Sequence, residues 1–244
     1  MRGRGFWDQK RVDTVTASAI LDRVAGVYAA ARTYQDTGLV TTTFTSPERA
    51  FTAETSFITA YSSTTGRFRF EFLAPLPTPG SSSPPSPERR QIIFRDRNGV
   101  YQWSHVKGLS AAQSLGRAVA RATGVSKGSA HRIPALLMPS EIGGRKLTSD
   151  TDSAERIDDA RLPTGECYRI RRMLQTETGV RTETVWIGGS SFLVRRVDTH
   201  GKQGVETVVD SRTIYEPLLD HPVPPDMLEL NAPPDEGFRT AVVR

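Results

Sequence analysis

The chain has 244 residues, a length that suits one large β-rich domain or two small ones and allows a sizeable buried core. Only 37% of the residues are hydrophobic, and the 20 glycines and 16 prolines indicate many turns rather than long helices. The apolar stretches are too short to span a bilayer, and the single cysteine, Cys167, excludes an intrachain disulfide and a cysteine-based zinc site.

Most of the net charge of +5 lies at the N-terminus. Residues 1–11 carry four basic side chains against one acid, a local charge of +3, so the rest of the chain is nearly neutral. No stripe of basic and aromatic residues that would follow a phosphate backbone appears elsewhere. We therefore predict a mobile basic tail over residues 1–15 and no nucleic-acid partner. Salt-dependent nucleic-acid binding through this tail is kept only as a third hypothesis.

An amphipathic helix is predicted to follow the tail. Its apolar residues recur at helical spacing, with Ser18 as the N-cap and Gly38 as the stop. The apolar stripe consists of Ile20, Leu21, Val24, Val27, Tyr28 and Ala31. Such a helix typically packs its apolar face on a sheet.

Three strands are predicted next, over residues 39–45, 54–62 and 67–73. In the third, Phe68, Phe70 and Phe72 alternate with charged residues and so share one face. A row of three phenylalanines must be covered. It forms either the core of the domain or the wall of an apolar pocket, and the sequence alone leaves both open.

Residues 75–90 are rich in proline and serine and are predicted to form a long loop inside the domain rather than a domain boundary. A hairpin over residues 91–106 follows. Its turn is at residues 96–99, where the Asn-Gly pair favours a tight reversal. The second strand of the hairpin has three aromatic side chains on one face: Tyr101, Trp103 and His105.

A second helix is predicted to begin with a capping box formed by Ser110 and Gln113 and to end near Gly124. It is rich in alanine and poor in bulky side chains, which lets it lie close to a sheet but anchors it weakly. Its apolar stripe is Leu109, Ala112, Leu115, Val119 and Ala122. Together with the short segment at 133–139, which contains Leu136 and Leu137, this helix is predicted to act as a movable lid.

The second half of the chain returns to strands from Ala154 onward. The additional strands are predicted at residues 166–174 and 204–215, on either side of a hairpin at 181–198. The proline-rich segment after Tyr215 is predicted to run along an edge of the sheet, where proline is tolerated.

The hairpin at 181–198 is central to the prediction. Strand-like residues 184–187 and 192–197 flank four residues, 188–191, whose glycines suit a turn with positive φ. Trp186 falls on one face, and Val185 and Ile187 fall on the other. Because both faces carry apolar groups, one face is predicted to pack on the core and the other to be covered or to face a ligand.

Motifs for catalysis or metal binding are weak. Residues 124–128 match the pattern G-x-S-x-G, but a helix rather than a strand is predicted to precede them. Residues 150–152 resemble the start of a calcium loop without its glycine and final glutamate. The four histidines lack ligand spacing, and P-loop and dinucleotide motifs are absent. We therefore predict no enzyme activity, no cofactor and no metal.

The order of these elements resembles the LolA/LolB superfamily of bacterial lipoprotein carriers, which includes RseB-type sensors and mycobacterial lipid-binding lipoproteins. The matching segments are residues 20–24 with Tyr28, residues 37–38, residues 184–187 and 192–197, and Tyr215 with residues 224–230. The resemblance implies an α+β fold, an incomplete antiparallel β-barrel or curved sheet wrapped over a few α-helices. It also implies one domain over residues 16–238, a C-terminal tail at 239–244, and an apolar cavity for acyl chains where no chemistry is done.

The leading functional hypothesis is non-enzymatic binding of an acyl chain, lipid or lipoprotein between sheet and helices, in the manner of an outer-membrane lipoprotein carrier. The expected partner is a lipid or acylated protein, with a membrane-associated partner as a further expectation. The predicted ligand-binding residues are Phe68, Phe70, Phe72, Tyr101, Trp103, Leu115, Val119, Leu136, Leu137, Trp186 and Phe192.

The alternative hypothesis is an extracytoplasmic sensor or protein-interaction domain of the same fold with a filled core and no lipid cargo. In either case we expect a monomer in the periplasm or cell envelope. Charged residues at 13 and 22–23 interrupt the apolar segment that a signal peptide needs, so an export signal or anchor would lie outside this sequence.

Overall fold

The computed structural model describes residues 15–74, 89–104, 107–149, 153–176, 179–204 and 206–230. Nearly all of the two predicted tails and of the predicted loop at 75–90 lie outside the described residues, and so do His105 and residues 150–152. Within the described ranges, no helix is long and apolar enough to cross a membrane.

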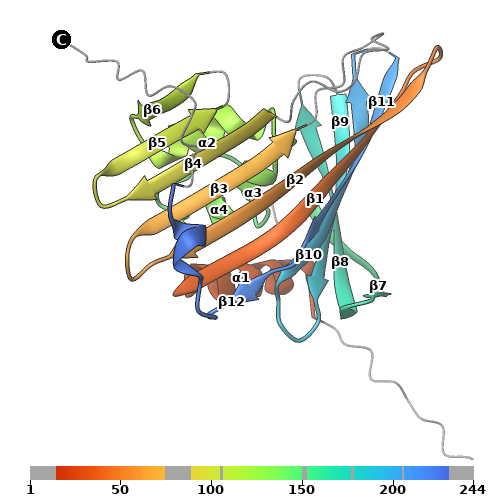
Figure 1. The fold of residues 1–244 in the computed structure, drawn as a ribbon. Helices are drawn as coiled ribbons and strands as arrows, with labels where there is room; N and C mark the ends of the chain where they lie inside the picture. Colours follow the sequence, from red (N-terminus) through yellow and green to blue (C-terminus); the bar gives the residue numbers. More distant parts are fainter. Residues whose placement is uncertain are drawn as a thin grey trace, which may run out of the picture.

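The described residues form one antiparallel sheet of 12 strands (Figure 1). The strands are β1 (Thr33–Thr45), β2 (Ala50–Ser62), β3 (Arg67–Ala74), β4 (Arg89–Asp96), β5 (Gly99–Ser104), β6 (Gly108–Ala112), β7 (Ala154–Leu162), β8 (Gly165–Thr176), β9 (Gly179–Gly188), β10 (Val194–Gln203), β11 (Thr207–Tyr215) and β12 (Leu218–Leu219). Their order is β6-β5-β4-β3-β2-β1-β11-β10-β9-β8-β7, and β12 pairs with β1. Because β6 and β7 remain separate edges, the sheet is an incomplete barrel, which confirms the predicted α+β class.

All four α-helices lie on one face of the sheet, the face that carries Phe68, Phe70 and Phe72 and is called the inner face (Figure 1). They are α1 (Ala17–Ala29), α2 (Leu115–Thr123), α3 (Ser129–Arg132) and α4 (Pro134–Leu137), counted within the described residues. The predicted first helix is confirmed, although its N-cap is Thr16 rather than Ser18. The Thr16 hydroxyl accepts a hydrogen bond of 3.2 Å from the Ala19 backbone N–H.

Gly38 does not stop a helix, as predicted, but lies inside β1. A Cβ atom at this position would lie 2.1 Å from the ring of Phe57 and 2.6 Å from the carbonyl oxygen of Ile214. Glycine is therefore required because an aromatic ring of the core rests directly on the β1 backbone. The helical stripe ends earlier, and β1 begins at Thr33.

The predicted start of the second helix is wrong. Residues 108–112 form strand β6, in which Leu109 pairs with Trp103, and the helix begins only after Ser114. The Ser114 hydroxyl caps it by accepting a hydrogen bond of 3.3 Å from the Arg117 backbone N–H. Pairing with β5 therefore prevails over the helical spacing of the apolar residues at the start of this segment.

The hairpin of β9 and β10 has the predicted faces, with Val185 and Ile187 buried on the inner face. Trp186 lies on the opposite face, called the outer face, which also carries Trp103. The positive φ predicted for the turn falls on Phe192 (φ 55°), and β10 begins at Val194 rather than at Phe192. The Phe192 ring lies 6.0 Å from the Tyr168 ring and 5.1 Å from the Arg23 guanidinium carbon, contacts that hold it in this conformation.

The inner face of the sheet and the helices share one core. The Phe70 ring lies 5.9 Å from the ring of Phe57 and 5.8 Å from that of Phe72, and the Phe57 ring lies 5.5 Å from that of Tyr215. All four aromatic side chains are buried. The covering helices contribute small side chains at the contact: Ala118, Ala122, Ala130 and Ala135. The row of phenylalanines is therefore part of a packed core.

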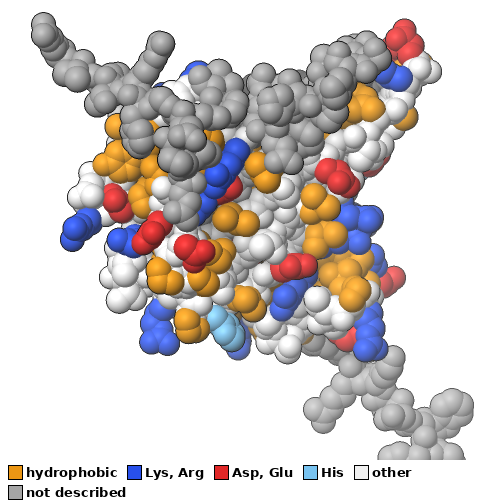
Figure 2. All heavy atoms as spheres, viewed as in Figure 1, with side chains coloured by type: hydrophobic (Ala, Val, Ile, Leu, Met, Phe, Trp, Pro, Cys, Tyr) orange, Lys and Arg blue, Asp and Glu red, His pale blue; other side chains and the backbone are white. Residues whose placement is uncertain are grey.

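The segment after β11 does not run along an edge of the sheet, as predicted, but crosses the outer face (Figure 1). After β12 it forms a 3-10 turn, η2 (Pro225–Leu228), against β2 and β3. The Arg69 guanidinium donates hydrogen bonds to the carbonyl oxygens of Asp226 (3.0 Å) and Glu229 (2.7 Å), and this side chain is buried as a result. Figure 2 shows apolar side chains interleaved with acids and bases over this face.

Candidate functional site

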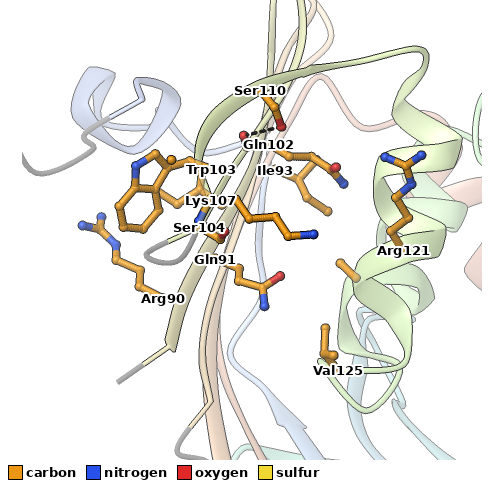
Figure 3. Close-up of a pocket in the computed structure, with 13 residues that line it drawn as sticks. Arg90, Gln91, Ile93, Gln102, Trp103, Ser104, Lys107, Ser110, Arg121 and Val125 are labelled. Carbon is orange, nitrogen blue, oxygen red and sulfur yellow. Dashed lines mark hydrogen bonds between the residues drawn. The ribbon is translucent and has the colours of Figure 1, made fainter. Parts of the chain in front are cut away.

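A cleft of about 680 Å³ separates α2 from the strands β4, β5 and β6 (Figure 3). Its lining consists of Arg90, Gln91, Ile92, Ile93, Gln102, Trp103, Ser104, Lys107, Gly108, Ser110, Arg121, Ala122 and Val125. Ala122 and Val125 come from the end of α2 and the turn after it. This volume lies within the range of about 300 to 1,000 Å³ that is typical of ligand sites.

The cleft adjoins the row of phenylalanines. Ile93 is the cross-strand partner of Phe70, and Gln91 is the partner of Phe72. The floor of the cleft and the buried aromatic row are therefore neighbouring parts of the same inner face. α2 packs against β4, β5 and β6, and the cleft lies between this helix and those strands, next to the row on β3.

Few polar contacts hold α2 to the strands. The side-chain amide of Gln102 donates a hydrogen bond of 3.0 Å to the carbonyl oxygen of Ala118. The remaining attachment is the buried stripe Leu115, Ala118, Val119 and Ala122, in which two of the four residues are alanine. Small side chains bury little apolar area, so the free energy that holds this helix down is modest.

The residues predicted to bind ligand are distributed over the molecule. Trp103 touches the cleft, although Figure 3 shows its ring on the far side of the strands from α2. The core contains Phe68, Phe70, Phe72, Leu115, Val119, Leu136 and Leu137. Tyr101 packs on a small outer-face cluster with Ile92, Phe94 and Trp103. Trp186 and Phe192 lie on other elements and do not line the cleft.

Trp186 has a different environment from the one predicted. Its ring lies between the guanidinium groups of Arg169 (5.1 Å) and Arg196 (4.5 Å) on the outer face. Its indole N–H donates a hydrogen bond of 2.8 Å to Asp198. Cation–π contacts and this hydrogen bond satisfy the side chain without a ligand. The lining residues that the sequence analysis did not name are partly polar and partly apolar, and no local pattern marks them, because they come together from β4, β5, β6 and the end of α2 only in the fold.

A buried ion-pair network connects α3 and residues 146–149 to the inner face. The Arg172 guanidinium donates hydrogen bonds of 2.9 and 2.6 Å to Glu183, and both side chains are at most 5% exposed. The same group donates to the carbonyl oxygens of Lys146 (3.2 Å) and Ser149 (2.9 Å). Arg132 of α3 lies 3.6 Å from Glu183 and donates to the Thr213 hydroxyl. The network thus fixes α3 and residues 146–149 to β8, β9 and β11.

Asp36 is a buried acid on the inner face of β1. Burial raises the pKa of its carboxyl group from 3.8 to about 6, although the Tyr34 hydroxyl donates a hydrogen bond of 2.7 Å that lowers it. The folded state therefore holds this proton more tightly than the unfolded chain does. Its contribution to stability is greatest below about pH 4 and is lost as the pH rises towards about 6.

Replacing Asp36 with asparagine is expected to stabilise the protein at neutral pH. The amide keeps an acceptor for Tyr34 and carries no charge, so the gain at about pH 7.5 should be roughly 2 to 3 kcal/mol, since one pKa unit corresponds to about 1.4 kcal/mol. Urea unfolding of both proteins at about pH 4 and about pH 7.5 measures this. An equal difference between the two proteins at both pH values would contradict the assignment.

A second depression, of about 480 Å³, lies on the outer face over β1, β9, β10 and β11. It contains His200, whose Nδ1 lies 2.7 Å from Asp210, but both side chains are more than half exposed. Such a surface pair contributes little energy. Within the described residues, no group of three histidine, cysteine, aspartate or glutamate side chains is placed to hold a metal ion.

No family model and no curated protein matches the sequence. Solved structures do match. MucB in complex with MucA has 13% sequence identity and a TM-score of 0.43, over 88% of this chain and 60% of that one. A DUF1329 family protein from Desulfovibrio piger has 9% identity and a TM-score of 0.35, over 87% and 95% of the two chains.

A LolA superfamily protein from Nitrosomonas europaea also matches, with 11% identity and a TM-score of 0.29 over 88% of this chain and 98% of that one. One of the matching structures is thus of a LolA superfamily protein. This LolA-like resemblance is the one predicted from the sequence. All three TM-scores are below 0.5 and the identities are at most 13%, so the functional proposal below rests on the cleft itself.

Proposed function

We propose that the protein binds an acyl chain, as part of a lipid or an acylated protein, in the cleft between α2 and strands β4 to β6. The observation that carries this proposal is the open space of about 680 Å³ beside the buried phenylalanine row. The role is that of a non-enzymatic, carrier-like protein of the cell envelope, acting as a monomer. As a carrier, the protein would transfer the bound lipid or acylated protein to a membrane-associated partner.

The apolar contacts available to a chain come from the floor and from α2. Ile93 provides the floor, and Ala122 and Val125 provide the opposite wall. Each methylene buried there contributes about 0.8 kcal/mol. An outward movement of α2 would add Phe70 and Phe72 to the ligand surface, because they are the strand neighbours of Ile93 and Gln91. The buried stripe of α2 is small, so the outward movement costs little free energy.

Blocking the cleft tests the proposal. Val125 is 48% exposed at the cleft, and Val125→Trp would place an indole in the space. We expect at least about a tenfold loss of affinity for a fluorescent fatty acid, since several methylenes at about 0.8 kcal/mol each lose their site. The matched control is Val180→Trp, because Val180 is a 55% exposed valine on β9, away from the cleft.

The result expected for the control is uptake equal to that of the wild type. Thermal unfolding of both variants checks that they remain folded. Wild-type protein that takes up no fatty acid, together with the absence of co-purifying lipid in native mass spectrometry, would reject the proposal. Equal uptake by Val125→Trp and Val180→Trp would reject the cleft as the site.

The alternative is a sensor or protein-interaction domain with no lipid cargo. The filled core favours it, because Phe68, Phe70 and Phe72 are almost completely buried without a ligand. In that case α2 is a permanent part of the core and the cleft is a surface depression. The fatty-acid experiment separates the two functions, since a sensor of this kind shows no saturable uptake.

A further inference from the structure

Two cations flank the cleft without a counter-charge. Lys107 precedes β6 and Arg121 lies on α2, and Figure 3 shows both side chains reaching towards the space between strands and helix. In the described part of the chain, neither side chain has an ion-pair partner, and no aspartate or glutamate lines the cleft. Both side chains are exposed and therefore free to meet a ligand.

The third basic residue of the lining is already neutralised. The Arg90 guanidinium lies 2.6 Å from Glu71 and 5.8 Å from the centre of the Trp103 ring, on the outer face. On the inner face, the Glu71 carboxylate could neutralise the other cations of the cleft as well. Instead, its charge is used on the other side of the sheet, and the cleft keeps a positive charge of about two, from Lys107 and Arg121.

The sequence around the cleft has the same bias. From Asp96 to Glu141 the chain contains no acidic residue in between, although it contains several lysines and arginines. This stretch builds β5, β6, α2, α3 and α4, which include parts of both walls of the cleft. A whole segment without acids keeps the local potential positive and raises the local concentration of anions.

Hydrogen-bond donors complete the arrangement. The amide group of Gln91 and the hydroxyl group of Ser104 also line the cleft, beside the Ser110 hydroxyl, which donates to the Gln102 carbonyl oxygen at 3.4 Å (Figure 3). A carboxylate or phosphate accepts several such bonds at once, and charge-assisted bonds from lysine and arginine are the strongest of them. The apolar surface of Ile93 and Ala122 lies in the same cleft, so an anionic group and an acyl chain can be bound together.

We infer that the cleft selects ligands with an anionic head group, a carboxylate or a phosphate, joined to an acyl chain. This inference rests on the proposed function, which concerns the chain alone, and adds the chemistry of the head. Lys107 and Arg121 hold the head group at the opening, and the chain lies towards Ile93 and the phenylalanine row. A neutral lipid of the same length would leave both cations unpaired and bind more weakly.

Three ligands with a chain of equal length test the inference: palmitate, hexadecyl phosphate and hexadecanol. Direct binding of each is measured by calorimetry with wild-type protein and with the double variant Lys107→Gln/Arg121→Gln. We expect the wild type to bind at least one of the two anions about tenfold more tightly than hexadecanol, because only the anions accept charge-assisted hydrogen bonds from Lys107 and Arg121. The double variant should lose this preference and keep its affinity for hexadecanol.

The control is Arg97→Gln/Arg161→Gln, which removes the same net charge at two exposed arginines that do not line the cleft. It should keep the preference of the wild type. A preference for both anions indicates recognition of any carboxylate or phosphate, and a preference for hexadecyl phosphate alone indicates a phosphate head group.

Equal binding of all three ligands by the wild type would overturn the inference and leave acyl binding intact. So would an anion preference that persists in the Lys107→Gln/Arg121→Gln variant. Failure of all three ligands to bind would overturn both the inference and the proposed function.

Discussion

Replacement of Arg172 by methionine is expected to lower the free energy of unfolding by about 3 to 5 kcal/mol. The side chain is 3% exposed and donates two hydrogen bonds to Glu183, which is 5% exposed. Without Arg172, the one cation left beside the buried carboxylate among the described residues is Arg132, at 3.6 Å, and the carbonyl oxygens of Lys146 and Ser149 lose a donor. Urea unfolding measures the change.

The neighbouring residue provides the control. Arg171 points to the other face, is 48% exposed and pairs at 2.8 Å with Glu155, which is 64% exposed. Arg171→Met should cost no more than about 1 kcal/mol, as for other exposed ion pairs. A cost for Arg172→Met that does not exceed the cost for Arg171→Met would mean that the buried network does not hold the helices to the sheet.

Truncation of Phe70 to alanine is the second large effect that we expect, about 3 to 5 kcal/mol. Its side chain is completely buried, and its ring packs between those of Phe57 and Phe72. Trp186→Ala should cost less, about 1 to 2 kcal/mol, because the partly exposed ring mainly loses two cation–π contacts of about 0.5 to 1 kcal/mol each.

The two variants also separate the core from the outer face in ligand binding. Urea unfolding gives both stabilities, and the fluorescent fatty acid gives uptake. Loss of uptake in Phe70→Ala but not in Trp186→Ala is expected if the acyl chain reaches the phenylalanine row. A larger loss of stability in Trp186→Ala than in Phe70→Ala would contradict the packing described here.

The strands were predictable because their side chains alternate over several residues. Phe68, Phe70 and Phe72 lie on one face as predicted, and so do Val185 and Ile187. The turn between β4 and β5 falls within the predicted residues 96–99 for a local reason: the Asp96 carboxylate accepts hydrogen bonds from the backbone N–H groups of Asn98 (2.7 Å) and Gly99 (3.2 Å). These features depend on residues that are close in sequence.

The errors occurred where distant contacts decide the structure. Leu109 and Ala112 have the spacing of a helix, but pairing of β6 with β5 makes this segment a strand. Phe192 has a positive φ that its residue type disfavours, and its contacts with Tyr168 and Arg23 compensate. Neither the pairing of β6 nor the contacts of Phe192 can be predicted from the local sequence pattern.

The cleft was only partly predictable, for a similar reason. A weakly anchored alanine-rich helix predicted a space beneath it, and a space is present beneath α2. Its chemistry was not predicted, because the predicted binding residues are apolar or aromatic, whereas the lining also contains Lys107, Arg121 and several uncharged polar side chains. Lys107 and Arg121 are separated by the whole of β6 and by a turn, so only the fold brings them to one opening.

The position of β1 in the sheet has a consequence for folding. On one side β1 pairs with β2, which follows it directly in the sequence. On its other side it pairs with β11, where Gly38 is the partner of Tyr215, so this edge is completed only by a late part of the chain. Contacts between such distant residues make folding slow. During synthesis, β1 therefore keeps an open hydrogen-bonding edge until β11 emerges, and an open strand edge of this kind can pair with other chains.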